Sequence, residues 1–182
     1  MEITWYTAMS MDGRLASADH SLAFLDLIGH RDDAEREFPD FIETIDAVLI
    51  GANTMRWLLD RGHGWPHGDL PTWLVTHDEQ LDERIGSTDQ PVVVHRGEVH
   101  QAVEQMREAG HRRVWLCGGG SIAGQLLRAD LLDEVNATVA PAIVGSGPAL
   151  AEGQNLPLRR FTLTQCEPIG GDAARLVWRR DR

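Results

Sequence analysis

The chain has 182 residues, of which 42% are hydrophobic and 25% are charged, and its formal net charge at pH 7 is −11. This length and composition fit one globular domain over residues 1–182, and the negative charge excludes general binding to nucleic acid, whose phosphates it would repel. The first residues lack the pattern of a signal peptide and no apolar run is long enough to cross a bilayer, so we expect no membrane partner and a cytoplasmic location.

The first third of the chain alternates strand and helix patterns. Residues 3–9 are rich in β-branched and aromatic side chains and predict a strand. Apolar residues recur at helical spacing over 30–45, where Pro39 predicts a kink or two short helices. The apolar run 47–50 predicts a strand buried on both faces, and the polar residues 53–54 that follow are expected to cap a helix.

The middle of the chain continues this alternation. A loop is expected over 60–70, where glycine and proline are frequent. Two short strands are predicted at 72–76 and 92–95. Residues 98–109 have the pattern of an amphipathic helix, which Gly110 ends.

The last part of the chain changes from alternation to strands alone. A strand is predicted at 114–117, a helix at 121–129 and another strand at 135–140. Two more strands, 161–165 and 174–178, flank a glycine-rich turn and predict an antiparallel hairpin. This order indicates an α/β fold with a mostly parallel sheet, helices on both faces and an antiparallel edge.

The strongest local signal is a buried strand that runs directly into Gly118, Gly119 and Gly120 and then into a helix at Ser121 and Ile122. Glycines let a backbone approach a ligand closely, and a helix N-terminus offers free N–H groups to a pyrophosphate. A tight turn without a ligand is the alternative. Three consecutive glycines exceed what such a turn requires, so we favour phosphate binding.

A second strand-to-helix turn lies upstream, at Gly51, Asn53 and Thr54. Alone it is explained equally well by a capped helix or by a ligand. A Rossmann fingerprint fits less well, because the glycine run lies two thirds along the chain and not in the first βα turn. Two helix N-termini that face one crevice would clamp the diphosphate of a dinucleotide.

The order of these segments resembles the dihydrofolate reductase superfamily. It is closest to the reductase domain of bifunctional riboflavin-biosynthesis proteins, the RibD C-terminal domain, and to the stand-alone relatives of that domain. The segments that carry the resemblance are 10–14, 46–54, 117–121, 131–135 and 141–148.

The resemblance implies a three-layer α/β/α fold of the dihydrofolate reductase type, with NADPH bound between the two turns. The backbone at Ala8 would meet the nicotinamide carboxamide, and Thr76 and His77 would lie near the adenosine 2′-phosphate. The residues implied in cofactor binding are Ala8, Gly51, Asn53, Thr54, Thr76, His77, Gly118, Gly119, Gly120, Ser121 and Ile122.

Two positions depart from the pattern or allow two roles. Folate reductases usually carry a basic residue after the glycine of the first turn, whereas this chain has Ala52, for which His77 or Arg96 would have to compensate. Asp12 is the candidate catalytic residue, orienting substrate or cofactor, but in the pair Asp12-Gly13 it is equally well a turn former.

The predicted function is that of an NADPH-dependent oxidoreductase. It would transfer a hydride to a C=N or C=O bond of a small heterocyclic or phosphoribosyl-pyrimidine-like substrate, and we expect a homodimer by analogy with stand-alone relatives. The alternatives are a non-catalytic dinucleotide-binding module and a flavin-dependent reductase. No metal is predicted, because neither Cys117 nor Cys166 belongs to a CxxC pair and the histidines lack ligand spacing.

Overall fold

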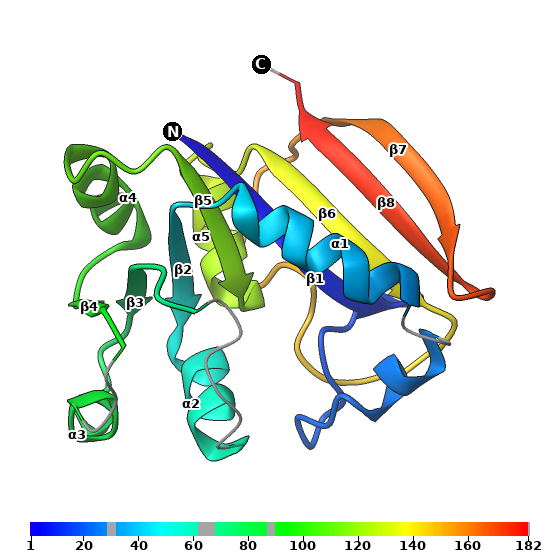
Figure 1. The fold of residues 1–182 in the computed structure, drawn as a ribbon, viewed down its shortest axis with the longest axis horizontal. Helices are drawn as coiled ribbons and strands as arrows, with labels where there is room; N and C mark the ends of the chain where they lie inside the picture. The colour runs from blue at the N-terminus through cyan, green and yellow to red at the C-terminus, as the bar shows by residue number, and fades with distance from the viewer. Residues whose placement is uncertain (29–31, 62–67, 87–89, 182) are drawn as a thin grey trace.

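The computed structural model describes residues 1–28, 32–61, 68–86 and 90–181. Eight strands form one sheet in the order β4-β3-β2-β5-β1-β6-β8-β7 (Figure 1). The strands are β1 (Glu2–Ser10), β2 (Ala47–Gly51), β3 (Thr72–Val75), β4 (Val92–His95), β5 (Arg113–Gly118), β6 (Glu134–Ala140), β7 (Phe161–Ile169) and β8 (Ala173–Arg180). The helices are the 3-10 helix η1 (Ala23–Ile28), α1 (Asp32–Glu43), α2 (Ala52–Arg61), α3 (Gln80–Gly86), α4 (Val99–Glu108) and α5 (Gly120–Arg128).

The sheet is mixed, as the sequence predicts. All pairings among β1 to β6 are parallel. Strand β8 pairs antiparallel with both β6 and β7 and completes the C-terminal hairpin. The prediction of a mostly parallel α/β sheet with an antiparallel edge is therefore confirmed.

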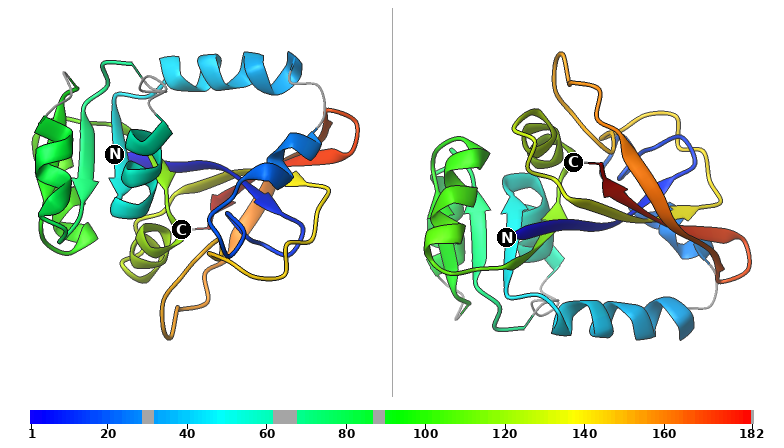
Figure 2. Two further views of the ribbon diagram at one scale, coloured as in Figure 1. Left: turned by 90° about the horizontal axis from the view of Figure 1, so that it is seen from below. Right: turned by 90° about the horizontal axis from the view of Figure 1, so that it is seen from above.

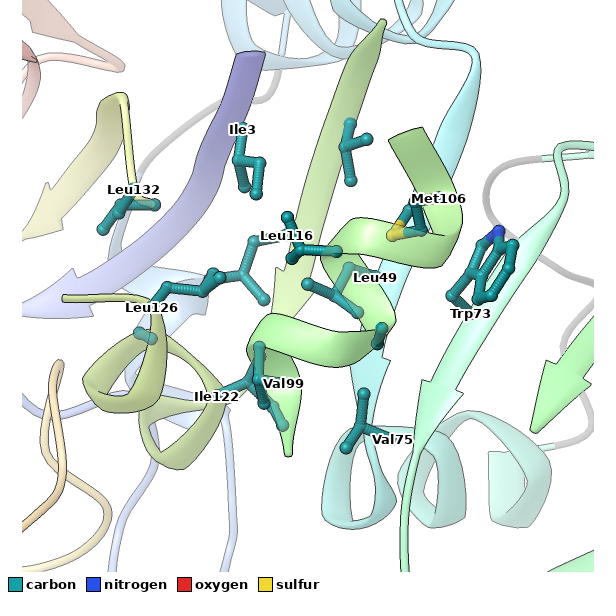
Figure 3. Close-up of a cluster of buried hydrophobic side chains, with 14 of the residues drawn as sticks. Ile3, Leu49, Trp73, Val75, Val99, Met106, Leu116, Ile122, Leu126 and Leu132 are labelled. Atoms are coloured by element: carbon teal, nitrogen blue, oxygen red, sulfur yellow. The ribbon is translucent and has the colours of Figure 1, made fainter. Parts of the chain in front are cut away.

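Helices cover both faces of the sheet, which gives the three-layer α/β/α arrangement (Figure 2). On one face, α4 and α5 pack on strand side chains such as Ile3, Leu49 and Leu116 (Figure 3). On the other face, α1 packs over Val48 and Trp115. Strand β2 is buried along its whole length because its side chains enter both layers.

Helix α1 differs from the expectation of a kink or two short helices. It is one helix, with Pro39 inside it. Pro39 is exposed, whereas Phe38 and Phe41 face the sheet and contact the rings of Tyr6 and Trp115. A proline on the solvent side leaves the freed carbonyl where water can reach it, so packing of the apolar face keeps the helix together.

Two local predictions need correction, and two short helices lie where none was predicted. Helix α2 begins at Ala52, so Asn53 and Thr54 lie in its first turn and not before it as caps. The loop expected over 60–70 is shortened by α2, which runs to Arg61, and residues 62–67 lie outside the described part of the chain. The helices η1 and α3 were not predicted, because both are short.

Among the described residues, no helix has the length and apolar character needed to cross a membrane.

Candidate functional site

A cleft of about 1180 Å³ opens at the carboxyl ends of the parallel strands. The ends of β1, β2, β3 and β5 line it, together with the starts of α2 and α5. In open α/β sheets, ligands bind in the crevice outside this edge. A second hollow of about 740 Å³ at the opposite edge contains none of the predicted site residues.

The cleft brings together all the residues that the resemblance implies in cofactor binding. These residues come from segments far apart in the sequence and belong to four strand ends. They are Ala8, Gly51, Asn53, Thr54, Thr76, His77, Gly118, Gly119, Gly120, Ser121 and Ile122. Their common location is a fact of the fold, and their roles toward a cofactor stay predictions.

The two glycine turns touch each other inside the cleft. A Cβ atom at Gly118, where φ is +156°, would lie only 2.8 Å from the Thr54 hydroxyl oxygen. A Cβ atom at Gly51 would lie 2.9 Å from the Ile122 side chain. Both positions therefore need glycine for close approach, and this approach brings the starts of α2 and α5 to one cleft. The peptide bond between Gly118 and Gly119 is cis.

The start of α5 presents backbone donors to the cleft. The N–H groups of Ile122 and Ala123 donate to the Gly119 carbonyl at 3.0 and 3.1 Å. For the N–H groups of Gly120 and Ser121, the described part of the chain supplies no backbone acceptor. Free N–H groups at a helix start attract an anion, and the helix dipole adds to this attraction.

One cation at the cleft was missed by sequence analysis. Arg56 lines the cleft, donates to the Asn53 side-chain oxygen at 2.7 Å and forms an ion pair with Asp78 at 2.5 Å. The Arg56 hydrogen bond and the Gln80 N–H lower the pKa of Asp78, so this carboxylate is charged at neutral pH. The available signal was spacing, because Arg56 lies one helical turn after Ala52 and shares its face of α2.

Arg96 lies outside the lining of the cleft, although its charge contributes to lowering the pKa of Asp78. Its guanidinium forms an ion pair with Asp82 of α3, and it does not line the cleft. His77, the other candidate, does line the cleft. Of the two residues proposed to compensate for Ala52, the structure therefore places only His77 at the site.

Part of the cleft wall is apolar and aromatic. It is formed by the segment before and within η1 and by residues of α2 and the central strands, namely Tyr6, Leu15, Ala16, Leu22, Leu25, Trp57 and Trp115. Cys117 also lines the cleft, and burial raises the pKa of its thiol to about 12. The thiol is therefore neutral at physiological pH and contributes wall surface, not a nucleophile. Among the described residues, no group of His, Cys, Asp and Glu side chains is arranged to hold a metal ion.

Asp12 is not among the residues that line the cleft, and its carboxylate is hydrogen-bonded to backbone N–H groups. Its carboxylate accepts hydrogen bonds from the Ser10 hydroxyl at 2.6 Å and from the N–H groups of Val144 and Gly145 at 3.0 and 2.8 Å. These contacts support the turn-forming role, and a catalytic role for Asp12 stays a prediction. Asp12 ties the turn after β1 to the segment that follows β6.

These hydrogen bonds make a prediction about stability. The Ser10 hydroxyl and the Val144 N–H lower the pKa of Asp12 from 3.8 to about 2. A depressed folded-state pKa stabilises the fold above the unfolded value, and this stabilisation is lost as the pH falls through the folded value. We expect Asp12→Asn to lower Tm at pH 7, with the difference from wild type closing between pH 3.8 and about 2. Asp172→Asn, in the exposed β7–β8 turn, is the control. It should leave Tm unchanged both at pH 7 and in the acidic range.

Comparison with known proteins agrees with this architecture. RibD from Mycobacterium tuberculosis is 30% identical over 157 residues, which cover 82% of this chain and 44% of that protein. The 2,5-diamino-6-ribosylamino-4(3H)-pyrimidinone 5′-phosphate reductase of Methanothermobacter thermautotrophicus is 25% identical over 183 residues and 82% of each chain is covered. A crystal structure from Shewanella sp. PV-4 shares the fold over 100% of both chains, with a TM-score of 0.86 and 22% identity.

The family model described as the RibD C-terminal domain matches residues 1–174, which is nearly the whole chain. The match covers both glycine turns and every strand that ends at the cleft. Together with the fold, it shows that this chain belongs to the family of RibD C-terminal domains, the reductases of riboflavin-biosynthesis type.

Proposed function

We propose that this chain is an NADPH-dependent reductase that transfers a hydride to a C=N or C=O bond of a small, phosphoribosyl-pyrimidine-like substrate. The observation that carries the proposal is the meeting of two glycine turns and two helix starts in one cleft. Membership of an oxidoreductase family supports the reaction class. The choice of NADPH and of the substrate is our inference.

The residues at the cleft fit a nicotinamide dinucleotide. The space at Gly119 is open, since a Cβ atom there would meet only the Thr54 hydroxyl oxygen, at an ordinary 3.5 Å. The Thr54 hydroxyl and the first N–H groups of α5 would hold the diphosphate from two sides. The backbone near Ala8 would hold the carboxamide of the ring. When bound, the reduced nicotinamide supplies the hydride, and the protein positions it.

The substrate would lie against the apolar and aromatic wall described above. A flat heterocycle stacks well on such surfaces, and Leu22 and Leu25 would exclude water from the reacting atoms. The reductase from Methanothermobacter acts on a ribosylaminopyrimidinone phosphate according to its name. We extend that substrate class to this chain as part of the proposal.

The test combines binding with turnover. A ligand at 100 times its Kd adds about 2.7 kcal/mol of stability, so a thermal-shift screen with NADPH, NADH and flavins should show a clear rise in Tm for NADPH. Oxidation of NADPH in the presence of ribosylaminopyrimidinone phosphates, followed at 340 nm (roughly the band of reduced nicotinamide), should then show turnover. Binding without turnover of any acceptor would favour a non-catalytic dinucleotide module. A yellow purified protein that binds flavin and not NADPH would contradict the proposal.

We also propose that the chain forms a homodimer through the C-terminal hairpin. Strand β7 is the edge of the sheet, and most of its residues are exposed, including Leu163. An exposed edge strand with apolar side chains favours pairing with a second copy. We expect sedimentation at micromolar concentration to give about twice the chain mass of 20.2 kDa, and Leu163→Glu to give the single-chain mass. A wild-type protein that sediments as a monomer would exclude this arrangement.

A further inference from the structure

Among the residues that the structure describes at the cleft, Arg56 is the one arginine, and the chain has no lysine. The other described side chains of the cleft that can carry a positive charge are His20 and His77. In the described part of the cleft, the permanent positive charge is therefore that of Arg56, in a protein whose net charge is −11. This place lies on the face of α2 that also carries Ala52, one turn away.

The Arg56 side chain is fixed between its own helix, α2, and the loop before α3. It donates from one terminal nitrogen to Asn53 at 2.7 Å and from the other to Asp78 at 2.5 Å. Asp78 is itself held, because its second oxygen accepts the Gln80 N–H at 3.0 Å and its own N–H donates to the Thr76 hydroxyl at 3.0 Å. The guanidinium is thus preorganised beside Thr76 and His77, at the end of β3.

We propose that Arg56 binds the 2′-phosphate of NADPH, and that Asp78 weakens this contact by holding part of the arginine's charge, so that the pair sets the preference between NADPH and NADH. The inference rests on the proposed function. It assigns cofactor choice to a residue one turn beyond the position that carries a basic residue in folate reductases.

The chemistry of the two side chains supports this division of roles. A guanidinium has five N–H donors, so the bonds to Asn53 and Asp78 leave donors for a phosphate. A phosphate matches the planar fork of arginine and forms charge-assisted hydrogen bonds with it. The Asp78 carboxylate, in contrast, would repel a 2′-phosphate and accept a hydrogen bond from the 2′-hydroxyl of NADH. We therefore expect the protein to bind NADPH more tightly than NADH, but by a moderate factor.

An alternative is that the ion pair only ties α2 to the start of α3. The alternative predicts that changes at Arg56 and Asp78 alter stability and affect both cofactors alike. Fragments of the cofactor separate the two ideas, since 2′,5′-ADP and 5′-AMP differ by the 2′-phosphate alone.

The experiment measures Kd by titration calorimetry for NADPH, NADH, 2′,5′-ADP and 5′-AMP. We expect Arg56→Gln to weaken NADPH and 2′,5′-ADP by about tenfold to a hundredfold, while NADH and 5′-AMP change by less than about twofold. Arg56→Lys should recover part of the loss, because it keeps the charge and not the fork. Asp78→Asn should raise the ratio of NADPH to NADH affinity by about tenfold. Arg179→Gln removes an ion-paired arginine of β8 that does not line the cleft, and it should change neither affinity.

Three outcomes would overturn the inference. If Arg56→Gln weakens both cofactors equally, Arg56 does not distinguish them, although the proposed function stands. If Arg56→Gln unfolds, the test rests on Asp78→Asn, and an unchanged ratio of NADPH to NADH affinity in that variant overturns the inference. If the wild-type protein binds neither NADPH nor NADH, the proposed function fails, and this inference fails with it.

Discussion

Replacing Gly119 with aspartate is expected to abolish NADPH binding while the protein stays folded. Gly119 precedes α5 with φ −118° and ψ −166°, an extended conformation that any residue adopts. A Cβ atom there meets nothing closer than the Thr54 hydroxyl oxygen at 3.5 Å, so the fold has room for a side chain. The new carboxylate would occupy the anion position at the helix start. Like charges in contact cost several kcal/mol, so we expect affinity for NADPH to fall by more than about a hundredfold.

A matched control separates this local effect from a general effect of charge. Gly86 ends α3 and lies outside the cleft, and no described atom lies within 4 Å of its Cβ position. Gly86→Asp adds the same charge and should leave NADPH affinity within about twofold of wild type. Both variants should unfold within about 2 °C of the wild-type Tm in the absence of ligand. Unchanged NADPH affinity in a folded Gly119→Asp protein would show that the glycine run is not a phosphate site.

The strands and the cleft were predictable from local pattern. Runs such as 47–50 and 114–117 are apolar because the central strands are buried on both faces, and the glycines that follow mark the close approach of two turns. A parallel sheet places the carboxyl ends of its strands at one edge. Strand ends that are distant in sequence, such as Ala8 and Thr76, therefore meet in one cleft without any information about pairing partners.

Other features depend on contacts that a local pattern does not contain. Pro39 breaks a helix by its own chemistry, yet α1 continues because the aromatic packing of Phe38 and Phe41 on the sheet lies on the opposite side. Asp12 was predicted either to orient substrate or cofactor or to form a turn, and its partners Val144 and Gly145 lie far along the chain. The sequence shows which groups are available, and only the fold shows which of them are already in use.

Arg56 illustrates the same limit at the candidate site. Folate reductases usually carry a basic residue at the position of Ala52, so the sequence comparison considers that position alone. Residues four apart in a helix share one face, so Arg56 can present its charge on the same side as Ala52. Asp78 belongs to the loop before α3, a helix too short to be predicted, so the ion pair that fixes Arg56 was not accessible from the sequence. The sequence pattern could place the charge of Arg56 on the same helix face as Ala52, but it could not identify Asp78 as the partner of that charge.

Gly124 in α5 leads to the second large expected effect, which is on stability. In an exposed helix, alanine in place of glycine stabilises by about 1 kcal/mol. Here the sign should reverse, because a Cβ atom at Gly124 would lie 1.8 Å from the carbonyl oxygen of Glu152. The segment that contains Glu152 is fixed on α5, since its N–H donates to the Gly120 carbonyl at 2.9 Å. No side-chain rotation relieves a clash with backbone, so the segment must move away from the helix.

We expect Gly124→Ala to destabilise the protein by about 2 kcal/mol, in the range of overpacked cores, and to lower Tm by about 4–8 °C for a chain of this size. Gly86→Ala is the control, because its Cβ position is open, and it should raise Tm slightly by restricting the unfolded chain. Glu152 also lines the cleft, so the displaced segment should weaken NADPH binding in Gly124→Ala and leave it unchanged in Gly86→Ala. Thermal unfolding with and without NADPH measures both effects. If Tm rises in Gly124→Ala as it does in the control, the contact between α5 and the segment at Glu152 does not determine the stability of this part of the site.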